Sequence, residues 1–163
     1  MRILGIDPGL AQTGYGVVDA LEGELHLVTY GVIHTEADEA IPNRLQTIYQ
    51  QVQALIAEYE PDAAALEQLF FGKNITSAIQ VGKAVGVISL ACAHAHLTVT
   101  EYSPAKIKDA VTGYGNADKA QVQLMVRNLL NLEETPRPDH AADSLAVAIT
   151  HFQHTRYQQL FEE

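Results

Sequence analysis

Three acidic residues of this sequence could form a catalytic site. Two of them end apolar segments, where a charge is costly, and the third lies at the start of a predicted helix. Asp7 ends the apolar run ILGI, and Glu67 ends the apolar segment AAALE. Acidic side chains are rarely buried unless they are paired or bind a metal. Asp143 follows His140 by three residues at the start of a predicted helix, so both project from one face. A preference of acids for helix N-termini also explains Asp143, and explains Asp139 equally well.

Convergence of these carboxylates would create a metal site. Two carboxylates about 4 Å apart repel each other by roughly 4 kcal/mol at an effective dielectric constant near 20. Either their pKa values rise or cations lie among them. Oxygen ligands with open coordination positions suit Mg²⁺ or Mn²⁺. Two such ions can activate a water molecule and stabilise the leaving oxygen of a phosphodiester, so the acidic residues favour metal-dependent hydrolysis.

The apolar pattern predicts strands and helices that would position these side chains. Glycine-bearing turns join the first three strands by short connections, which favours an antiparallel meander. A helical stripe of apolar residues lies between Pro42 and Pro61, and Asn116 is predicted to cap a later helix. The predicted strands cover residues 2–6, 15–20, 25–33, 63–67 and 98–102, and the predicted helices cover 42–59, 74–96, 105–111, 116–130 and 140–157.

This order of elements predicts an α/β fold with a mixed five-stranded sheet flanked by helices. The first three strands are expected to be antiparallel, and right-handed crossovers would add two parallel strands. The first and fourth strands can then lie side by side, with Asp7 and Glu67 at their carboxyl ends, where open α/β sheets place their sites. Residues 1–157 are expected to form a single domain, followed by a short tail at 158–163.

Composition limits the class of protein. The chain has 163 residues, of which 47% are hydrophobic and 18% charged, and no apolar run is expected to span a membrane. The single cysteine, Cys92, excludes an internal disulfide and fits a reducing cytoplasm. A net charge of −10 argues against a polyanionic partner, but residues 73–127 carry six basic and three acidic residues. We therefore expect a basic surface around an acidic pit.

Several linked motifs resemble the bacterial RuvC Holliday junction resolvases. The resemblance implies a ribonuclease H-like fold and a homodimeric, Mg²⁺-dependent endonuclease. Such enzymes cut four-way DNA junctions by paired symmetric nicks in recombination and repair, with the RuvA and RuvB branch-migration proteins. The motifs, in order from residue 2 to about 154, are GIDPG, TGYGVV, LEQLFFGKN, VGKAVGV, EYSPAKIKDAVTGYG, ADKAQVQLMVRNLL and DHAADSLAVAITH.

The resemblance also implies roles for individual residues. The catalytic metal-binding acids of the family fall on Asp7, Glu67 and Asp143, and the fourth metal-site position falls on His140. Many members have aspartate at this fourth position, whereas others have histidine. Neutral imidazole is a suitable ligand for Mn²⁺ and, less readily, for Mg²⁺. Two Mg²⁺ ions per site are expected, and Mn²⁺ could replace them.

Basic and aromatic positions of the family suggest where DNA would bind. Lys108 and Lys119 match basic positions near the scissile phosphate, although each could equally be an exposed lysine beside a helix cap. Phe70 matches an aromatic residue that stacks against or opens junction bases. The neighbouring Phe71 could share this role, although one of the two could instead belong to the core. Weaker candidates for DNA contact are Lys73, Lys83 and Lys106.

Small residues suggest a dimer interface. Ala78, Gly82 and Gly86 recur every four residues on one helix, so another helix could approach that face closely. The approaching helix could belong to a second subunit, as the resemblance implies, or packing within the chain could explain the pattern. A two-fold dimer would place two sites on opposed strands of a junction.

Three alternative functions compete with this interpretation. An actin- or hexokinase-type ATP-binding protein also has an Asp-x-Gly turn after a strand, but it needs a second such domain and loop. An inactive junction-binding module would be expected to lose some acidic ligands, whereas Asp7, Glu67 and Asp143 are all present. A related nuclease could act on RNA–DNA hybrids. Digesting a four-way junction, a linear duplex and an RNA–DNA hybrid side by side distinguishes these functions.

Overall fold

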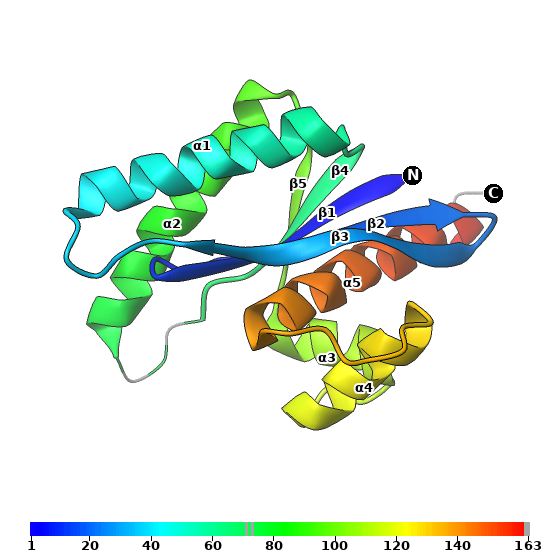
Figure 1. The fold of residues 1–163 in the computed structure, drawn as a ribbon. Coiled ribbons are helices and arrows are strands. Elements are labelled where there is room, and N and C mark those ends of the chain that lie inside the picture. The colour runs from blue at the N-terminus through cyan, green and yellow to red at the C-terminus, as the bar shows by residue number, and fades with distance from the viewer. Residues whose placement is uncertain (71, 73, 162–163) are drawn as a thin grey trace.

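A five-stranded sheet lies between two layers of helices in the computed structural model, which describes residues 1–70, 72 and 74–161 (Figure 1). Helices α1 and α2 cover one face, and α5 covers the other with α3 and α4 beside it. The strands are β1 (Arg2–Asp7), β2 (Gln12–Leu21), β3 (Glu24–His34), β4 (Ala63–Glu67) and β5 (Val99–Tyr102). The helices are α1 (Ile41–Tyr59), α2 (Ile75–His94), α3 (Pro104–Thr112), α4 (Lys119–Leu129) and α5 (Asp139–Phe161).

The strand order is β3-β2-β1-β4-β5, which confirms the predicted mixed sheet. β1 pairs antiparallel with β2 and parallel with β4, where Ile6 lies opposite Leu66. The next residues along these two strands are Asp7 and Glu67, so both stand at the same edge of the sheet. The strands become adjacent because the crossover through α1 returns the chain alongside β1.

Two glycines allow α5 to lie directly on the sheet. A Cβ atom added at Gly5 would come within 2.1 Å of the backbone oxygen of Ser144, and one at Gly14 within 1.9 Å of the backbone oxygen of His140. Any larger residue would therefore push α5 away from β1 and β2. The buried face of α5 includes Leu145 and Ile149, both fully buried in the core between this helix and the sheet. This close packing fixes the start of α5 beside the ends of β1 and β4.

Some element boundaries differ from the predicted ones. Asp118, not Asn116, caps α4: its side chain accepts a hydrogen bond from the Gln121 backbone N–H, and the Gln121 side chain accepts one from the Asp118 backbone N–H. This reciprocal pair satisfies two backbone N–H groups, whereas an isolated asparagine would satisfy one. α5 continues to Phe161, beyond the predicted end at residue 157. The element types agree with the prediction throughout the described residues.

Helix α2 departs from the expectation that no apolar run reaches the length of a membrane span. Over 18 residues its mean hydropathy is 1.5, enough to cross a membrane by length and composition. Lys83 is its only Lys, Arg, Asp or Glu residue, and its many small residues add little polarity. One side of α2 packs against α1 and the sheet through Ala84 and Ile88, while Ile79 on the other side is 53% exposed. The apolar character of α2 therefore exceeds what its contacts within the chain require.

Candidate active site

Asp7 and Glu67 form one wall of the candidate site at the carboxyl ends of β1 and β4. Asp7 is only 8% exposed although its side chain ends in a carboxyl group, and Glu67 is partly buried beside it. The turn after Asp7 is held by Thr13, whose hydroxyl donates a 2.6 Å hydrogen bond to the Gly9 carbonyl oxygen. Thr13 is itself 1% exposed, so this contact fixes the turn from inside the protein. The carboxylate of Asp7 is thus positioned by the sheet and by the turn that follows it.

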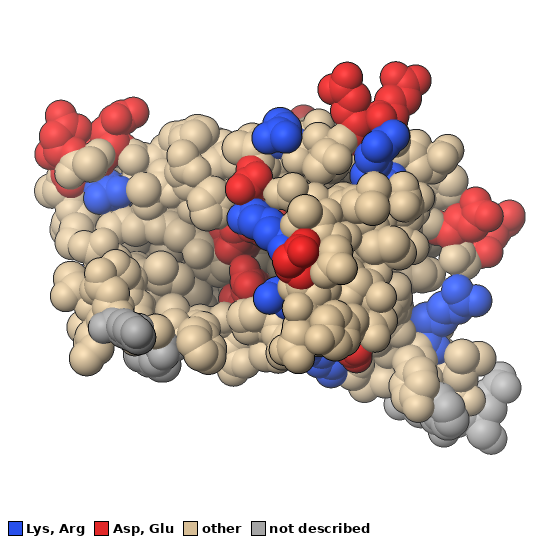
Figure 2. Space-filling view, turned by 90° about the horizontal axis from the view of Figure 1, so that it is seen from below, with Lys and Arg blue, Asp and Glu red and all other residues tan. Residues whose placement is uncertain are grey.

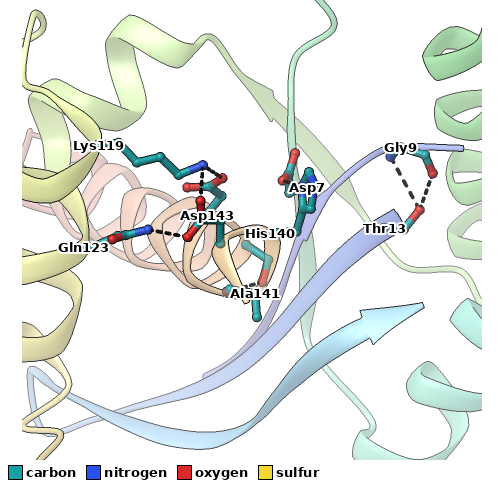
Figure 3. A network of polar contacts seen from close by, with 10 residues as sticks. Asp7, Gly9, Thr13, Lys119, Gln123, His140, Ala141 and Asp143 are labelled. Atoms are coloured by element: carbon teal, nitrogen blue, oxygen red, sulfur yellow. Dashed lines mark hydrogen bonds and ion pairs between the residues drawn. The ribbon is translucent and has the colours of Figure 1, made fainter. Parts of the chain in front are cut away.

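The start of α5 supplies the opposite wall. His140 Nδ1 lies 2.7 Å from Asp7 Oδ2, and the side chain of Asp143 projects from the same end of the helix (Figure 3). Ligand atoms of Asp7, His140 and Asp143 all lie within 4.8 Å of one another. Glu67 is not a member of this group of three, but its carboxyl interacts directly with that of Asp7. The structure therefore brings Asp7, His140 and Asp143 together, with Glu67 beside Asp7.

Burial and mutual repulsion shift the protonation of these carboxyls. Burial, together with the charge and hydrogen bonding of Asp7, raises the pKa of Glu67 to about 8. Burial also raises the pKa of Asp143, although the nearby ammonium of Lys119 opposes this rise. Without another cation, such a site holds protons near neutral pH. A divalent cation can replace these protons, because clustered carboxylate oxygens are suitable ligands for Mg²⁺ or Mn²⁺. The residues of the site therefore fit a divalent metal.

Two lysines lie beside the acidic group. Lys108 and Lys119 line a hollow of about 240 Å³ whose wall also includes Glu67 and Asp143. The ammonium of Lys119 lies 3.2 Å from Asp143 Oδ2 and 3.3 Å from Asp139 Oδ2. Both lysines can therefore contact a phosphate held at the carboxylates.

The other predicted DNA-contact residues have different surroundings. Phe70 is 74% exposed three residues after Glu67, as a base-stacking role requires. The ammonium of Lys106 lies 5.4 Å from the centre of the Tyr102 ring instead of lining the hollow. Lys73 and Phe71 lie outside the described residues.

Opposite charges are arranged close together on one face of the molecule. Figure 2 shows a hollow with acidic atoms inside it and basic side chains along one side. Most other acidic groups in this view lie at the outer edges of the molecule. A chain of net charge −10 can therefore still present cations next to its acidic hollow, where a phosphate backbone would lie.

The predicted dimer residues share one helix but differ in burial. Ala78 is 5% exposed and packs within the chain. A Cβ atom at Gly82 would contact Leu69 of the same chain at 3.5 Å, whereas one at Gly86 would meet open space. Packing within the chain therefore explains why the residue at position 78 is small, and it covers part of Gly82. Gly86 faces outward and is left open to a partner.

Sequence reasoning missed Gln123, which joins the polar network of the site. Its side-chain amide donates a 3.0 Å hydrogen bond to Asp139 Oδ1 (Figure 3). The signal was its spacing: Gln123 follows Lys119 by four residues, so both side chains lie on one face of α4. Which residue that face would meet depended on how α4 packs against α5.

Sequence comparison places this chain among known nucleases. Residues 3–151 match the family described as crossover junction endodeoxyribonuclease RuvC. A relative of that name from Brevibacillus brevis is 50% identical over 99% of this chain and 98% of its own. Another from Heliobacterium modesticaldum is 53% identical over 91% of this chain and 92% of its own.

Solved structures give the same result for the fold. The Thermus thermophilus RuvC structure aligns with a TM-score of 0.91 at 37% identity, covering 97% of each chain. T. thermophilus RuvC in complex with a Holliday junction substrate aligns with a TM-score of 0.92, covering 97% of this chain and 96% of that one. The yeast mitochondrial Holliday junction resolvase Ydc2 shares the fold at 16% identity, with a TM-score of 0.74.

Proposed function

Because this chain belongs to the RuvC family of crossover junction endodeoxyribonucleases, we propose that its acidic hollow cuts four-way DNA junctions by paired symmetric hydrolysis. The protein is an endonuclease with a ribonuclease H-like fold that resolves Holliday junctions. The observation that carries the proposal is the meeting of Asp7, His140 and Asp143 within 4.8 Å, with Glu67 against Asp7. These residues come from three separate elements, so their meeting is a property of the fold.

The proposed site holds Mg²⁺, with two ions per site and Mn²⁺ as a possible substitute. Asp7, Glu67 and Asp143 would supply oxygen ligands, and His140 would supply a nitrogen. Bound there, Mg²⁺ would supply Lewis-acid stabilisation of the phosphate and would favour ionisation of the attacking water. The raised pKa values of Glu67 and Asp143 support the proposal, because a divalent cation would stabilise the ionised carboxylates that burial and mutual repulsion disfavour.

The remaining residues of the hollow bind and orient the DNA strand. Lys119 and Lys108 place positive charge beside the carboxylates, where it can offset charge that develops on the phosphate. Phe70, three residues after Glu67, is exposed and can stack on a base, because every base has a face available to an aromatic ring. Lys106, which does not line the hollow, and Lys73 remain weaker candidates for DNA contact.

The proposed active form is a homodimer formed through the outer side of α2. Ile75, Ile79 and Leu90 on this helix are 68%, 53% and 48% exposed, and Gly86 on the same helix leaves room for a partner. An exposed apolar surface of this kind marks an interaction site. A two-fold axis there would present two hollows to the two strands that must be cut. We also propose RuvA and RuvB as partners and the cytoplasm as the location.

Digestion of three substrates tests the proposed function. A four-way junction, a linear duplex and an RNA–DNA hybrid are incubated with the protein and Mg²⁺, and the junction alone should receive paired nicks. Asp7→Asn and Glu67→Gln should abolish cutting and leave junction binding largely intact, because they remove ligands without removing bulk. Glu101→Gln is the matched control, since Glu101 is exposed on β5. Preferred cutting of the hybrid, or loss of folding in the two site variants, would overturn the proposal.

A further inference from the structure

Lys119 lies between two carboxylates that differ in their surroundings. Its ammonium is 3.2 Å from Asp143 Oδ2 and 3.3 Å from Asp139 Oδ2, and its side chain is 52% exposed (Figure 3). Lys119 is therefore a fixed cation at the edge of the acidic hollow. Its position depends on two contacts instead of one.

The two carboxylates are not equally available to pair with the Lys119 ammonium when a metal is bound. Asp143 belongs to the group formed with Asp7 and His140, so its charge is shared with whatever cation that group binds. Asp139 lies outside this group, and its side chain is 53% exposed. Its carboxylate instead contacts the Lys119 ammonium, 3.3 Å from Oδ2, and the Gln123 side-chain amide, 3.0 Å from Oδ1. Asp139 thus remains available to Lys119 when Asp143 is engaged elsewhere.

Gln123 fixes the orientation of Asp139. Its amide donates to Asp139 Oδ1 over 3.0 Å, which leaves Oδ2 for the ammonium of Lys119. Lys119 and Gln123 lie one turn apart on α4, so two donors of one helix meet the two oxygens of a single carboxylate. Asp139 stands in the first turn of α5, where the helix dipole also favours a negative charge. Both helices therefore hold this carboxylate in one orientation.

We propose that Asp139 and Gln123 are positioning residues that hold the Lys119 ammonium beside the reacting phosphate. The inference rests on the proposed function, because it assigns Lys119 a role in junction cutting. Asp139 does not bind metal or DNA in this role. It acts through Lys119, and a cation displaced by about an ångström can lose much of its effect on a reaction.

A double-mutant cycle tests the coupling between Asp139 and Lys119. Asp139→Ala, Lys119→Ala and the double variant are compared by single-turnover cutting of a four-way junction at saturating protein. We expect Asp139→Ala to slow cutting about tenfold, Lys119→Ala to slow it about a hundredfold, and the double variant to match Lys119→Ala. Junction binding in EDTA should be unchanged or tighter for Asp139→Ala, because the substitution removes a negative charge near the DNA.

Other variants distinguish positioning from general effects. Glu134→Ala removes an exposed negative charge from the loop before α5 and should cut at the wild-type rate. Asp139→Asn keeps an acceptor for Lys119 and should recover part of the lost rate, and Gln123→Ala should lose two- to fivefold. Circular dichroism verifies that each variant is folded, and Asp139→Asn serves as the test if the alanine variant is not.

Three results would overturn the inference. Wild-type cutting by Asp139→Ala would show that Lys119 needs no such support. Multiplicative losses in the double variant would show that the two residues act independently. A higher Mg²⁺ requirement for Asp139→Ala would make Asp139 a metal ligand. Failure of the wild-type protein to cut junctions would instead refute the proposed function, so the two failures are distinguishable.

Discussion

Replacing Glu67 by glutamine should stabilise the metal-free protein increasingly as the pH rises. Burial and the neighbouring Asp7 raise the pKa of Glu67 from 4.5 to about 8, so ionisation of this carboxyl opposes folding. Below pH 4.5 the carboxyl is protonated in both states, and the two proteins should be similarly stable. Between pH 4.5 and 8 only the unfolded state loses the proton, so wild-type stability falls with pH. Glutamine has nearly the same shape and does not ionise.

The pKa interval sets the size of the effect. Each pH unit contributes at most about 1.4 kcal/mol, so the whole interval from 4.5 to about 8 gives a ceiling near 5 kcal/mol. Relaxation of the site and entry of water reduce such penalties in real proteins. We therefore expect Glu67→Gln to be about 2 to 3 kcal/mol more stable than wild type at pH 8, and less than about 1 kcal/mol more stable at pH 5.

Urea unfolding in EDTA at pH 5, 6.5 and 8, followed by circular dichroism, measures this difference. Glu101→Gln provides the matched control, because Glu101 is exposed on β5 opposite Leu66 and should show no comparable trend. Added Mg²⁺ should then stabilise wild type more than Glu67→Gln at pH 8, since metal binding requires the ionised carboxylate.

An equal stability difference at pH 5 and pH 8 would refute this reasoning. It would mean that Glu67 is already ionised in the folded protein at pH 5. A Glu67→Gln variant that is less stable than wild type at pH 8 would be stronger evidence against this reasoning, because the Glu67 carboxylate would then make a net favourable contact.

Three further predictions concern the site and the dimer. His140→Asp should keep metal-dependent cutting, because aspartate supplies an oxygen ligand suited to Mg²⁺, whereas His140→Ala should lose more of the cutting rate. Cutting rates in Mg²⁺ and in Mn²⁺ measure this difference. A fully active alanine variant would show that His140 is not part of the site. Gly14→Ala should lower the free energy of unfolding by about 1 to 3 kcal/mol and slow cutting, because the added Cβ atom would displace the start of α5. An unchanged thermal unfolding temperature would contradict this prediction. Ile79→Glu places charge on the exposed side of α2 and should reduce the sedimentation coefficient to that of a folded monomer, whereas unchanged sedimentation would exclude this face as the interface.

The placement of Asp7 and Glu67 could be predicted because it follows from local patterns and general topology. Apolar runs and short turns define the strands, and a right-handed crossover places β4 parallel to β1. The ends of α4 were less predictable, because Asn116 and Asp118 are both good capping residues. The reciprocal hydrogen bonds with Gln121 selected Asp118.

The exposed apolar side of α2 was also ambiguous in sequence. Small residues at four-residue intervals suit a partner helix or packing within the chain equally well. The structure separates them: Ala78 is buried within the chain, and Gly86 faces open space. The spacing of small residues shows only that another element can approach this face of the helix closely. Which element does so depends on the tertiary structure.

The sequence by itself determined the class of fold, the order of its elements and the two acidic strand ends, because hydrophobic periodicity and turn residues act over short distances. Only the tertiary structure decided that His140 Nδ1 meets Asp7 Oδ2 at 2.7 Å across 133 residues of chain. It also decided that Lys119 lies between Asp139 and Asp143 while Gln123 holds Asp139. These contacts depend on how α4 and α5 sit on each other and on the sheet. A shift of about an ångström in either helix breaks a hydrogen bond without altering the pattern of apolar residues that specifies the helix.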